Sequence, residues 1–199
     1  MSISLVAGLG NPGRDYADTR HNLGWVVIDA FARRHGLAWQ KASRFDADVA
    51  RWDYAPGQTR WLVKPLSFMN DSGGPVRSFA SFHKIPGTAI LAVFDDIAID
   101  LGRVKVSEAG GAGGHNGVAS LIECLGDGFV RYRLGIGPRQ PPQMDLKDFV
   151  LGKFTPAQLS LLDQNLDTTL NGLDLLFQSG VAQAMNTLNR RSNHETDQT

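Results

Sequence analysis

The stretch Ile3-Ser4-Leu5-Val6-Ala7-Gly8-Leu9-Gly10-Asn11-Pro12-Gly13 decides the fold, because an apolar run ends within it at a glycine-rich turn. The run Ile3 to Ala7 predicts a buried strand, and residues 22–35 have apolar side chains at helical spacing. A strand followed by a turn and a helix indicates an α/β layer structure. We therefore expect Asn11 just beyond the end of a strand and His21 near the first turn of a helix.

The same alternation of strands and helices continues along the chain. Further strands are predicted at 47–54, 60–64, 89–94, 103–107 and 131–136, and further helices at 75–84, 116–125 and 156–178. The linker Ala55-Pro56-Gly57-Gln58-Thr59 is typical of a hairpin, so a mixed sheet flanked by helices is expected. A chain of 199 residues, 42% of them hydrophobic, can bury one substantial core. We expect a single domain at 1–190 and a polar tail at 191–199.

Bulk composition excludes several classes of protein. Twenty Lys and Arg residues balance twenty Asp and Glu residues, so net charge indicates no particular partner. The lone cysteine, Cys124, excludes an intramolecular disulfide and is typical of a reducing compartment. No apolar stretch approaches the length of a membrane span, and the first residues are unlike a signal peptide. These features predict a cytoplasmic protein that does not contact membranes.

The residue types at the first turn suggest acid–base chemistry. A helix N-terminus carries partial positive charge, which disfavours an imidazolium and keeps His21 neutral. A neutral imidazole can accept a proton from water, as a general base does. The amide of Asn11 can donate to a carbonyl and accept from an N–H. The turn also matches G-x-G-x-x-G, but Pro12 and the absence of an immediate helix argue against a dinucleotide site.

Two later segments each permit a structural and a functional interpretation. Asn70 follows a predicted strand and precedes a predicted helix. Either Asn70 or Ser72 caps this helix, or Asn70 is free to bind a ligand. Phe68 and Met69 lie either in the core or beside a binding pocket. Asp95 and Asp96 end an apolar strand, where one carboxylate orients an imidazole or both form an exposed acidic turn. Spacing alone does not separate these alternatives.

The glycine-rich segment 110–114 precedes His115 and Asn116 at the start of a predicted helix, which repeats the His21-Asn22 arrangement. Such a segment is either mobile or lets backbone N–H groups approach an anion, and no P-loop motif follows it. The five histidines show no metal-ligand spacing, so no metal is expected. There is also no G-x-S-x-G motif, so a hydrolase would use activated water.

Taken together, these segments resemble the bacterial peptidyl-tRNA hydrolase family over residues 3–189. The matching pieces, in chain order, are Gly8 to Gly13, Thr19-Arg20-His21-Asn22, Phe68-Met69-Asn70, Asp95-Asp96, Gly113 to Gly117 and Arg131-x-Arg133-Leu134-Gly135. The set is specific although each piece alone is not. The resemblance implies a monomeric α/β protein with a twisted mixed sheet and no cofactor, which cleaves the ester between a peptide and the 3′-terminal ribose of tRNA.

The resemblance also implies roles for individual residues. His21 would be the catalytic base, and Asp95 rather than Asp96 would orient it. The substrate-binding set implied is Asn11, Tyr16, Phe68, Met69, Asn70, His115 and Asn116, in which the three asparagines hold the peptide and the water.

For the 5′ phosphate of tRNA, Arg133 matches a family residue. The usual lysine falls at Ser107, so Lys105 or Arg103 replaces it or phosphate binding is weaker. The alternative function is a non-catalytic RNA-binding protein on the same fold, against which the intact His21, Asp95 and asparagines argue.

Overall fold

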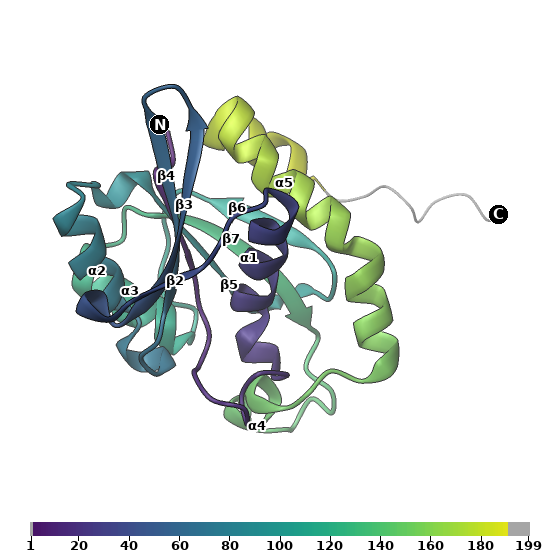
Figure 1. Ribbon diagram of the computed structural model, residues 1–199. Helices are drawn as coiled ribbons and strands as arrows, with labels where there is room; N and C mark the ends of the chain where they lie inside the picture. Colours follow the sequence, from purple (N-terminus) through teal and green to yellow (C-terminus); the bar gives the residue numbers. More distant parts are fainter. Residues whose placement is uncertain (1, 191–199) are drawn as a thin grey trace.

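The computed structural model describes residues 2–190 and contains a seven-stranded mixed sheet (Figure 1). The strands lie in the order β2-β3-β4-β1-β5-β7-β6. Their bounds are β1 Leu5–Gly8, β2 Gln40–Ala42, β3 Ala47–Ala55, β4 Gln58–Pro65, β5 Ile90–Asp100, β6 Val104–Ser107 and β7 Val130–Gly137. The pairs β1–β4, β1–β5 and β5–β7 are parallel, whereas β2–β3, β3–β4 and β6–β7 are antiparallel. The predicted mixed sheet is therefore confirmed.

Helices cover both faces of this sheet. Their bounds are α1 Leu23–Arg34, α2 Gly73–Phe82, α3 Asn116–Leu125, α4 Leu146–Leu151 and α5 Pro156–Leu188. Helices α1 and α5 pack on one face and α2 and α3 on the other (Figure 1). No helix between residues 2 and 190 combines the length and the apolar character needed to cross a membrane.

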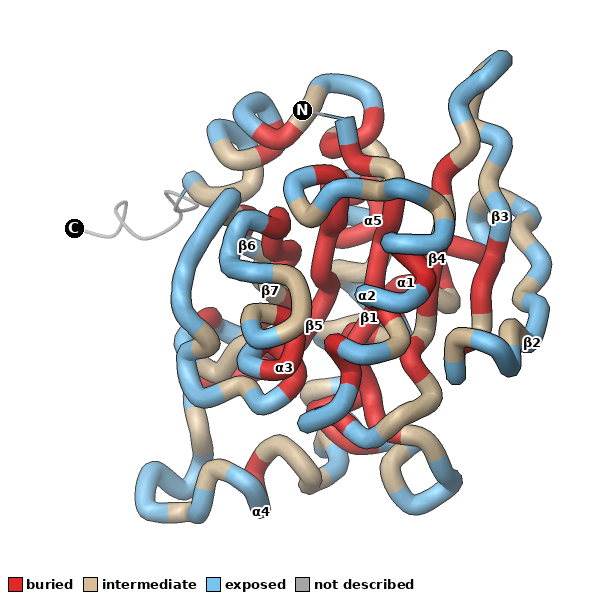
Figure 2. Tube along the Cα trace, turned by 90° about the vertical axis from the view of Figure 1, so that its left-hand side faces the viewer, coloured by how far each residue is buried: buried red, intermediate tan, exposed pale blue. Residues whose placement is uncertain are grey.

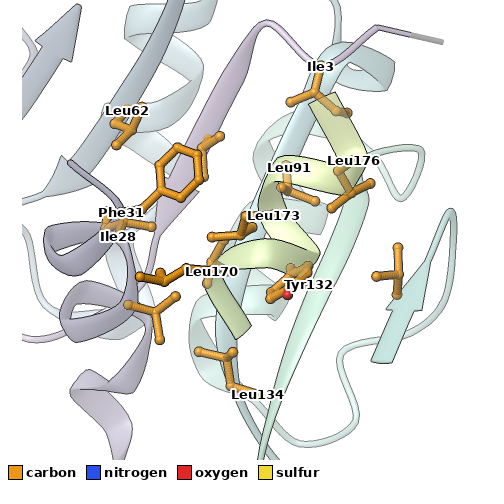
Figure 3. Packing of buried hydrophobic residues seen from close by; sticks show 14 of the residues in the cluster. Ile3, Ile28, Phe31, Leu62, Leu91, Tyr132, Leu134, Leu170, Leu173 and Leu176 are labelled. Carbon is orange, nitrogen blue, oxygen red and sulfur yellow. The ribbon is translucent and has the colours of Figure 1, made fainter. Parts of the chain in front are cut away.

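The central strands are buried on both faces, as Figure 2 shows for β1 and for the first part of β5, residues 90–95. Alternate residues point to opposite sides, so Val6 and Leu91 contact the α1–α5 layer while Leu5 and Ile90 contact the α2–α3 layer. Figure 3 shows the first of these layers, in which Phe31 of α1 and leucines of α5 pack over the sheet. Burial of this kind is the main stabilisation of the fold.

Several local expectations differ from the structure. The strand β2 and the helix α4 were not predicted. Helix α5 extends to Leu188, beyond the predicted end, although Gly180 interrupts it with φ 81° and ψ 172°. Ser72 does not cap α2 with its side chain, because its hydroxyl donates to the carbonyl of Met69 (2.9 Å).

The topology brings the predicted polar residues to one edge. Because β1, β4 and β5 are parallel neighbours, their carboxyl ends meet at the same side of the sheet. Asn11 follows β1, Met69 lies in the 3₁₀ turn η3 (Met69–Asp71) after β4, and Asp95 lies within β5. His21 lies in the 3₁₀ turn η1 (Arg20–Asn22), immediately before α1. This edge is therefore the place to look for a site.

Candidate active site

His21 and Asp95 form the centre of the site. The two residues are 7% and 2% exposed, and His21 Nδ1 lies 3.0 Å from Asp95 Oδ1 and 3.2 Å from Oδ2. Gly24 allows this approach, since a Cβ at that position would lie 2.4 Å from the carbonyl of Val93 and 2.5 Å from that of Leu9. The start of α1 can thus pack directly against β1 and β5, which brings η1 next to Asp95.

A second imidazole binds the same carboxylate oxygen. His115 Nε2 lies 3.1 Å from Asp95 Oδ1, and His115 Nδ1 accepts a hydrogen bond from the backbone N–H of Val118 (3.2 Å). An Nδ1 that accepts must lack a proton, so in the neutral ring Nε2 carries the hydrogen and donates it to Asp95. This geometry defines the tautomer of His115.

The carboxylate of Asp95 is ionised in this arrangement. Burial alone would raise the pKa of the Asp95 carboxyl, but the charge interactions with His115 and His21 and the hydrogen bonds from both rings outweigh it. The pKa of Asp95 is therefore held well below its usual value. An ionised carboxylate accepts from His21 Nδ1–H, which leaves His21 Nε2 with a free lone pair.

Asn11 is held by a second network, which the sequence analysis missed. The backbone N–H of Asn11 donates to Asn22 Oδ1 (2.8 Å), and Asn22 Nδ2 donates to the carbonyl of Asn11 (2.9 Å). The side-chain oxygen of Asn11 accepts from the backbone N–H of Met69 (2.8 Å). Because this oxygen is occupied, the amide nitrogen is the atom of Asn11 that is left to donate to a ligand.

These residues open into one cleft of about 470 Å³. All nine residues predicted to bind substrate or act in catalysis line it, namely Asn11, Tyr16, His21, Phe68, Met69, Asn70, Asp95, His115 and Asn116. Tyr16 and Phe68 contact edge to face with ring centres 6.1 Å apart, and Phe68 is 54% exposed. Asn70 and Asn116 are exposed. Gly117 lets α3 approach, because a Cβ there would lie 2.5 Å from Met69 Sδ.

Helix α4 provides a further wall that the sequence analysis did not anticipate. Leu146, Lys147, Val150 and Leu151 of this helix line the cleft. The helix has only six residues, too few for a periodic pattern to show. Sequence reasoning thus found the polar residues of the cleft but not its outer wall.

His21, Asp95 and His115 also form a group whose ligand atoms lie within 4.8 Å of one another, as a metal site would require. The hydrogen bonds account for this grouping without an ion. For His115 Nε2 to bind a metal, its proton would have to move to Nδ1, which would break the hydrogen bond from Val118. The arrangement therefore fits a carboxylate shared by two N–H donors better than a metal centre.

The two predicted phosphate-binding residues lie beside each other, outside the residues that line the cleft. Lys105 of β6 is the direct register partner of Arg133 on β7. Arg133 Nε donates to Asp96 Oδ2 (2.7 Å), so Asp96 is not the free acidic turn considered above. Ser107 lies opposite Arg131, whose buried guanidinium donates to the carbonyls of Asp127 and Phe129.

Known proteins resemble this chain over nearly its whole length. The family model described as peptidyl-tRNA hydrolase matches residues 5–196. The chain belongs to the peptidyl-tRNA hydrolase family. Peptidyl-tRNA hydrolase of Gloeobacter violaceus is 40% identical over 193 residues, which are 96% of each chain. That of Anaeromyxobacter sp. strain K is 41% identical over 191 residues, covering 96% of this chain and 98% of the relative.

Solved structures show the same peptidyl-tRNA hydrolase fold. The crystal structure of the enzyme from Acinetobacter baumannii superposes with a TM-score of 0.86 at 36% identity, with 94% of each chain covered. A crystal structure of a peptidyl-tRNA hydrolase in complex with n-propanol gives a TM-score of 0.87 at the same identity and coverage. The family and the single-domain α/β fold expected from the sequence are confirmed.

Proposed function

We propose that His21 is the general base with which this member of the peptidyl-tRNA hydrolase family cleaves the ester of peptidyl-tRNA. The observation that carries the proposal is the pair of hydrogen bonds from His21 Nδ1 and His115 Nε2 to one buried carboxylate oxygen. It leaves His21 Nε2 unprotonated at the cleft. The established substrate of the family has an ester that water can attack.

The reaction balances with these groups. His21 Nε2 takes a proton from water, and the oxygen of that water bonds to the ester carbonyl carbon. Asp95 stabilises the imidazolium that forms. The C–O bond to the ribose then breaks, and His21 returns its proton to the departing oxygen. The products are a peptide carboxylic acid, which releases its proton to solvent, and a tRNA with a free 3′-terminal hydroxyl.

We assign the three asparagines to the peptide and the carbonyl. The amide nitrogen of Asn11 donates to the substrate, because its oxygen is bound to the backbone of Met69. Asn70 and Asn116 at the rim bind the peptide backbone. Amides form directional hydrogen bonds with backbone groups and do not read side chains, which suits a substrate of any peptide sequence.

The remaining residues of the cleft contribute in other ways. Tyr16, Phe68 and Met69 provide the apolar surface around the ester. His115 was expected to bind substrate, but both of its ring nitrogens have partners within the protein. We therefore assign His115 to the orientation of Asp95.

We assign phosphate binding to Lys105 and Arg133, which are cross-strand neighbours. Lys105 is exposed, and only Nε of Arg133 is bound to Asp96, so the terminal nitrogens of Arg133 can face an anion. Arg103 is less suited, since it pairs with Asp100 (4.0 Å) and donates to the carbonyl of Arg190. The proposal includes a monomeric cytoplasmic enzyme, in keeping with a cleft built from one chain.

The test is release of peptide from purified N-acyl-aminoacyl-tRNA by the wild type and by His21→Ala. General-base catalysis contributes roughly 10²–10⁴-fold, so turnover by the variant should fall by about that factor while RNA binding is retained. Wild-type turnover by His21→Ala would show that the base is a different group. A wild-type protein that binds RNA without releasing peptide would favour the non-catalytic alternative.

A further inference from the structure

Arg20, the residue before the proposed base, is a buried cation with an unusual environment. It is 8% exposed, and burial lowers the pKa of its guanidinium. No carboxylate among residues 2–190 forms an ion pair with it, and its Nε has no hydrogen-bond partner there. A buried charge without a counter-ion is costly, so its retention calls for a specific role.

The side chain of Arg20 contacts α4, which lines the cleft, and the start of α5. Nη1 donates to the carbonyl of Phe149 in α4 (3.1 Å), and Nη2 donates to Gln158 Oε1 at the start of α5 (3.1 Å). The guanidinium carbon lies 4.5 Å from the centre of the Phe149 ring and 5.3 Å from that of Phe154. The planar guanidinium of an arginine can donate to two acceptors and stack on an aromatic ring at the same time, which the ammonium of a lysine cannot do.

The backbone strengthens the same connection. The N–H of Arg20 donates to the carbonyl of Gly152 (3.0 Å), and Thr19 forms an isolated β-bridge with Lys153. Gly152 leaves room for the guanidinium, because a Cβ there would lie 2.8 Å from Arg20 Nη1. Figure 1 shows α4 below the N-terminal end of α1, and α4 contacts η1.

Helix α4 depends on such a connection for its position. An isolated helix of six residues is unstable in water, and Phe149 is its only buried residue. Leu146, Lys147, Val150 and Leu151 of the helix line the same cleft as His21. The guanidinium therefore lies between the turn that holds the base and the wall that contacts the substrate.

We propose that Arg20 is a positioning residue that sets the distance between His21 and the α4 wall of the cleft. The proposal rests on the proposed function only for its kinetic consequence, because the tether itself can be measured without turnover. Small displacements of reacting groups have large effects on rate. Replacement of the guanidinium should therefore lower kcat and raise KM in a protein that still folds.

The experiment compares Arg20→Lys with the wild type. We expect kcat per folded molecule to fall by on the order of tenfold to hundredfold, with a higher KM. The pH dependence of kcat should not move, because Asp95 still orients His21. Amide hydrogen exchange over 146–152 should become faster in Arg20→Lys.

Two further variants keep the test decisive. In Gly152→Ala the new Cβ would lie 2.8 Å from Arg20 Nη1 and 3.1 Å from the carbonyl of Asp148, so it forces the guanidinium and α4 apart. It should give the same kinetic and exchange changes, also if Arg20→Lys does not fold. The control Tyr132→Phe removes a buried hydrogen bond to the carbonyl of Thr169 (2.6 Å) and leaves the hydrogen bonds of Arg20 intact, so it should lower the melting temperature without changing kcat.

Unchanged kcat and unchanged amide exchange over 146–152 in Arg20→Lys or Gly152→Ala would overturn the proposal. A variant in which only the melting temperature falls, with kcat and exchange unchanged, would overturn it as well. Failure of the proposed base has a different signature. In that case His21→Ala would keep its turnover, while Arg20→Lys would still speed exchange in α4.

Discussion

The replacement Asp95→Asn removes one charge at the centre of the site and keeps the size of the side chain. In the wild type, the carboxylate accepts N–H groups from His21 at 3.0 Å and from His115 at 3.1 Å. An asparagine can offer either a neutral oxygen or an NH₂ group at this place. The neutral amide oxygen accepts weaker hydrogen bonds than the carboxylate does. The NH₂ group can only donate, so it would require His21 Nδ1 to lack its proton, which is the wrong tautomer for a base at Nε2.

The expected loss can be worked from the distance. Opposite unit charges 3.0 Å apart interact by about 5 kcal/mol at an effective dielectric constant of about 20. This interaction is fully present only when His21 is an imidazolium, as in the transition state. At roughly 1.4 kcal/mol for each factor of ten, kcat of Asp95→Asn should fall by about 10³–10⁴-fold.

The assay is single-turnover release of peptide from N-acyl-aminoacyl-tRNA with enzyme in excess, with circular dichroism to confirm folding. The matched control is Asp96→Asn, which neutralises the neighbouring carboxylate that pairs with Arg133. Its kcat should fall by less than about tenfold. A folded Asp95→Asn protein with kcat near that of the wild type would refute the assignment of Asp95.

Three further predictions concern the supports of the site. Asn22→Ala removes both hydrogen bonds to the backbone of Asn11. The free energy of unfolding should therefore fall by about 1–3 kcal/mol, with a matching loss of kcat/KM. Wild-type values of both quantities would contradict the network. In Lys105→Ala, the slope of log affinity for tRNA against log salt concentration should become shallower by about 0.9, whereas Arg103→Ala should leave the slope unchanged. The opposite result would place the phosphate at Arg103. Because the pKa of Asp95 is lower in the folded than in the unfolded state, its carboxylate stabilises the fold above the ordinary carboxyl pKa, and this stability is lost as pH falls below that value. Urea unfolding should therefore show a steeper acid loss in the wild type than in Asp95→Asn, and equal slopes would be inconsistent with the buried carboxylate.

The parts of the site that sequence could predict are those that follow apolar runs. Asn11, Asn70 and Asp95 each come after or at the end of a strand pattern, and parallel strands bring such positions together. The rest of the cleft-lining set was implied by the resemblance to a family, which also selected Asp95 over Asp96.

The parts that sequence could not predict depend on contacts between distant segments. The tautomer of His115 depends on a backbone N–H in α3, and the orientation of Asn11 depends on Asn22. Helix α4 and strand β2 are too short to show a period. The continuation of α5 past Gly180 depends on the burial of Val181 and Ala184 against the core.

The most direct test of the central claim is ¹⁵N NMR of the histidine rings at neutral pH, with His21→Gln and His115→Gln for assignment. We expect opposite tautomers, with the proton on Nδ1 in His21 and on Nε2 in His115. In Asp95→Asn, His21 should lose this preference for a proton on Nδ1. A proton on Nε2 of His21 in the free enzyme would contradict the account, because that nitrogen could not then accept a proton from water.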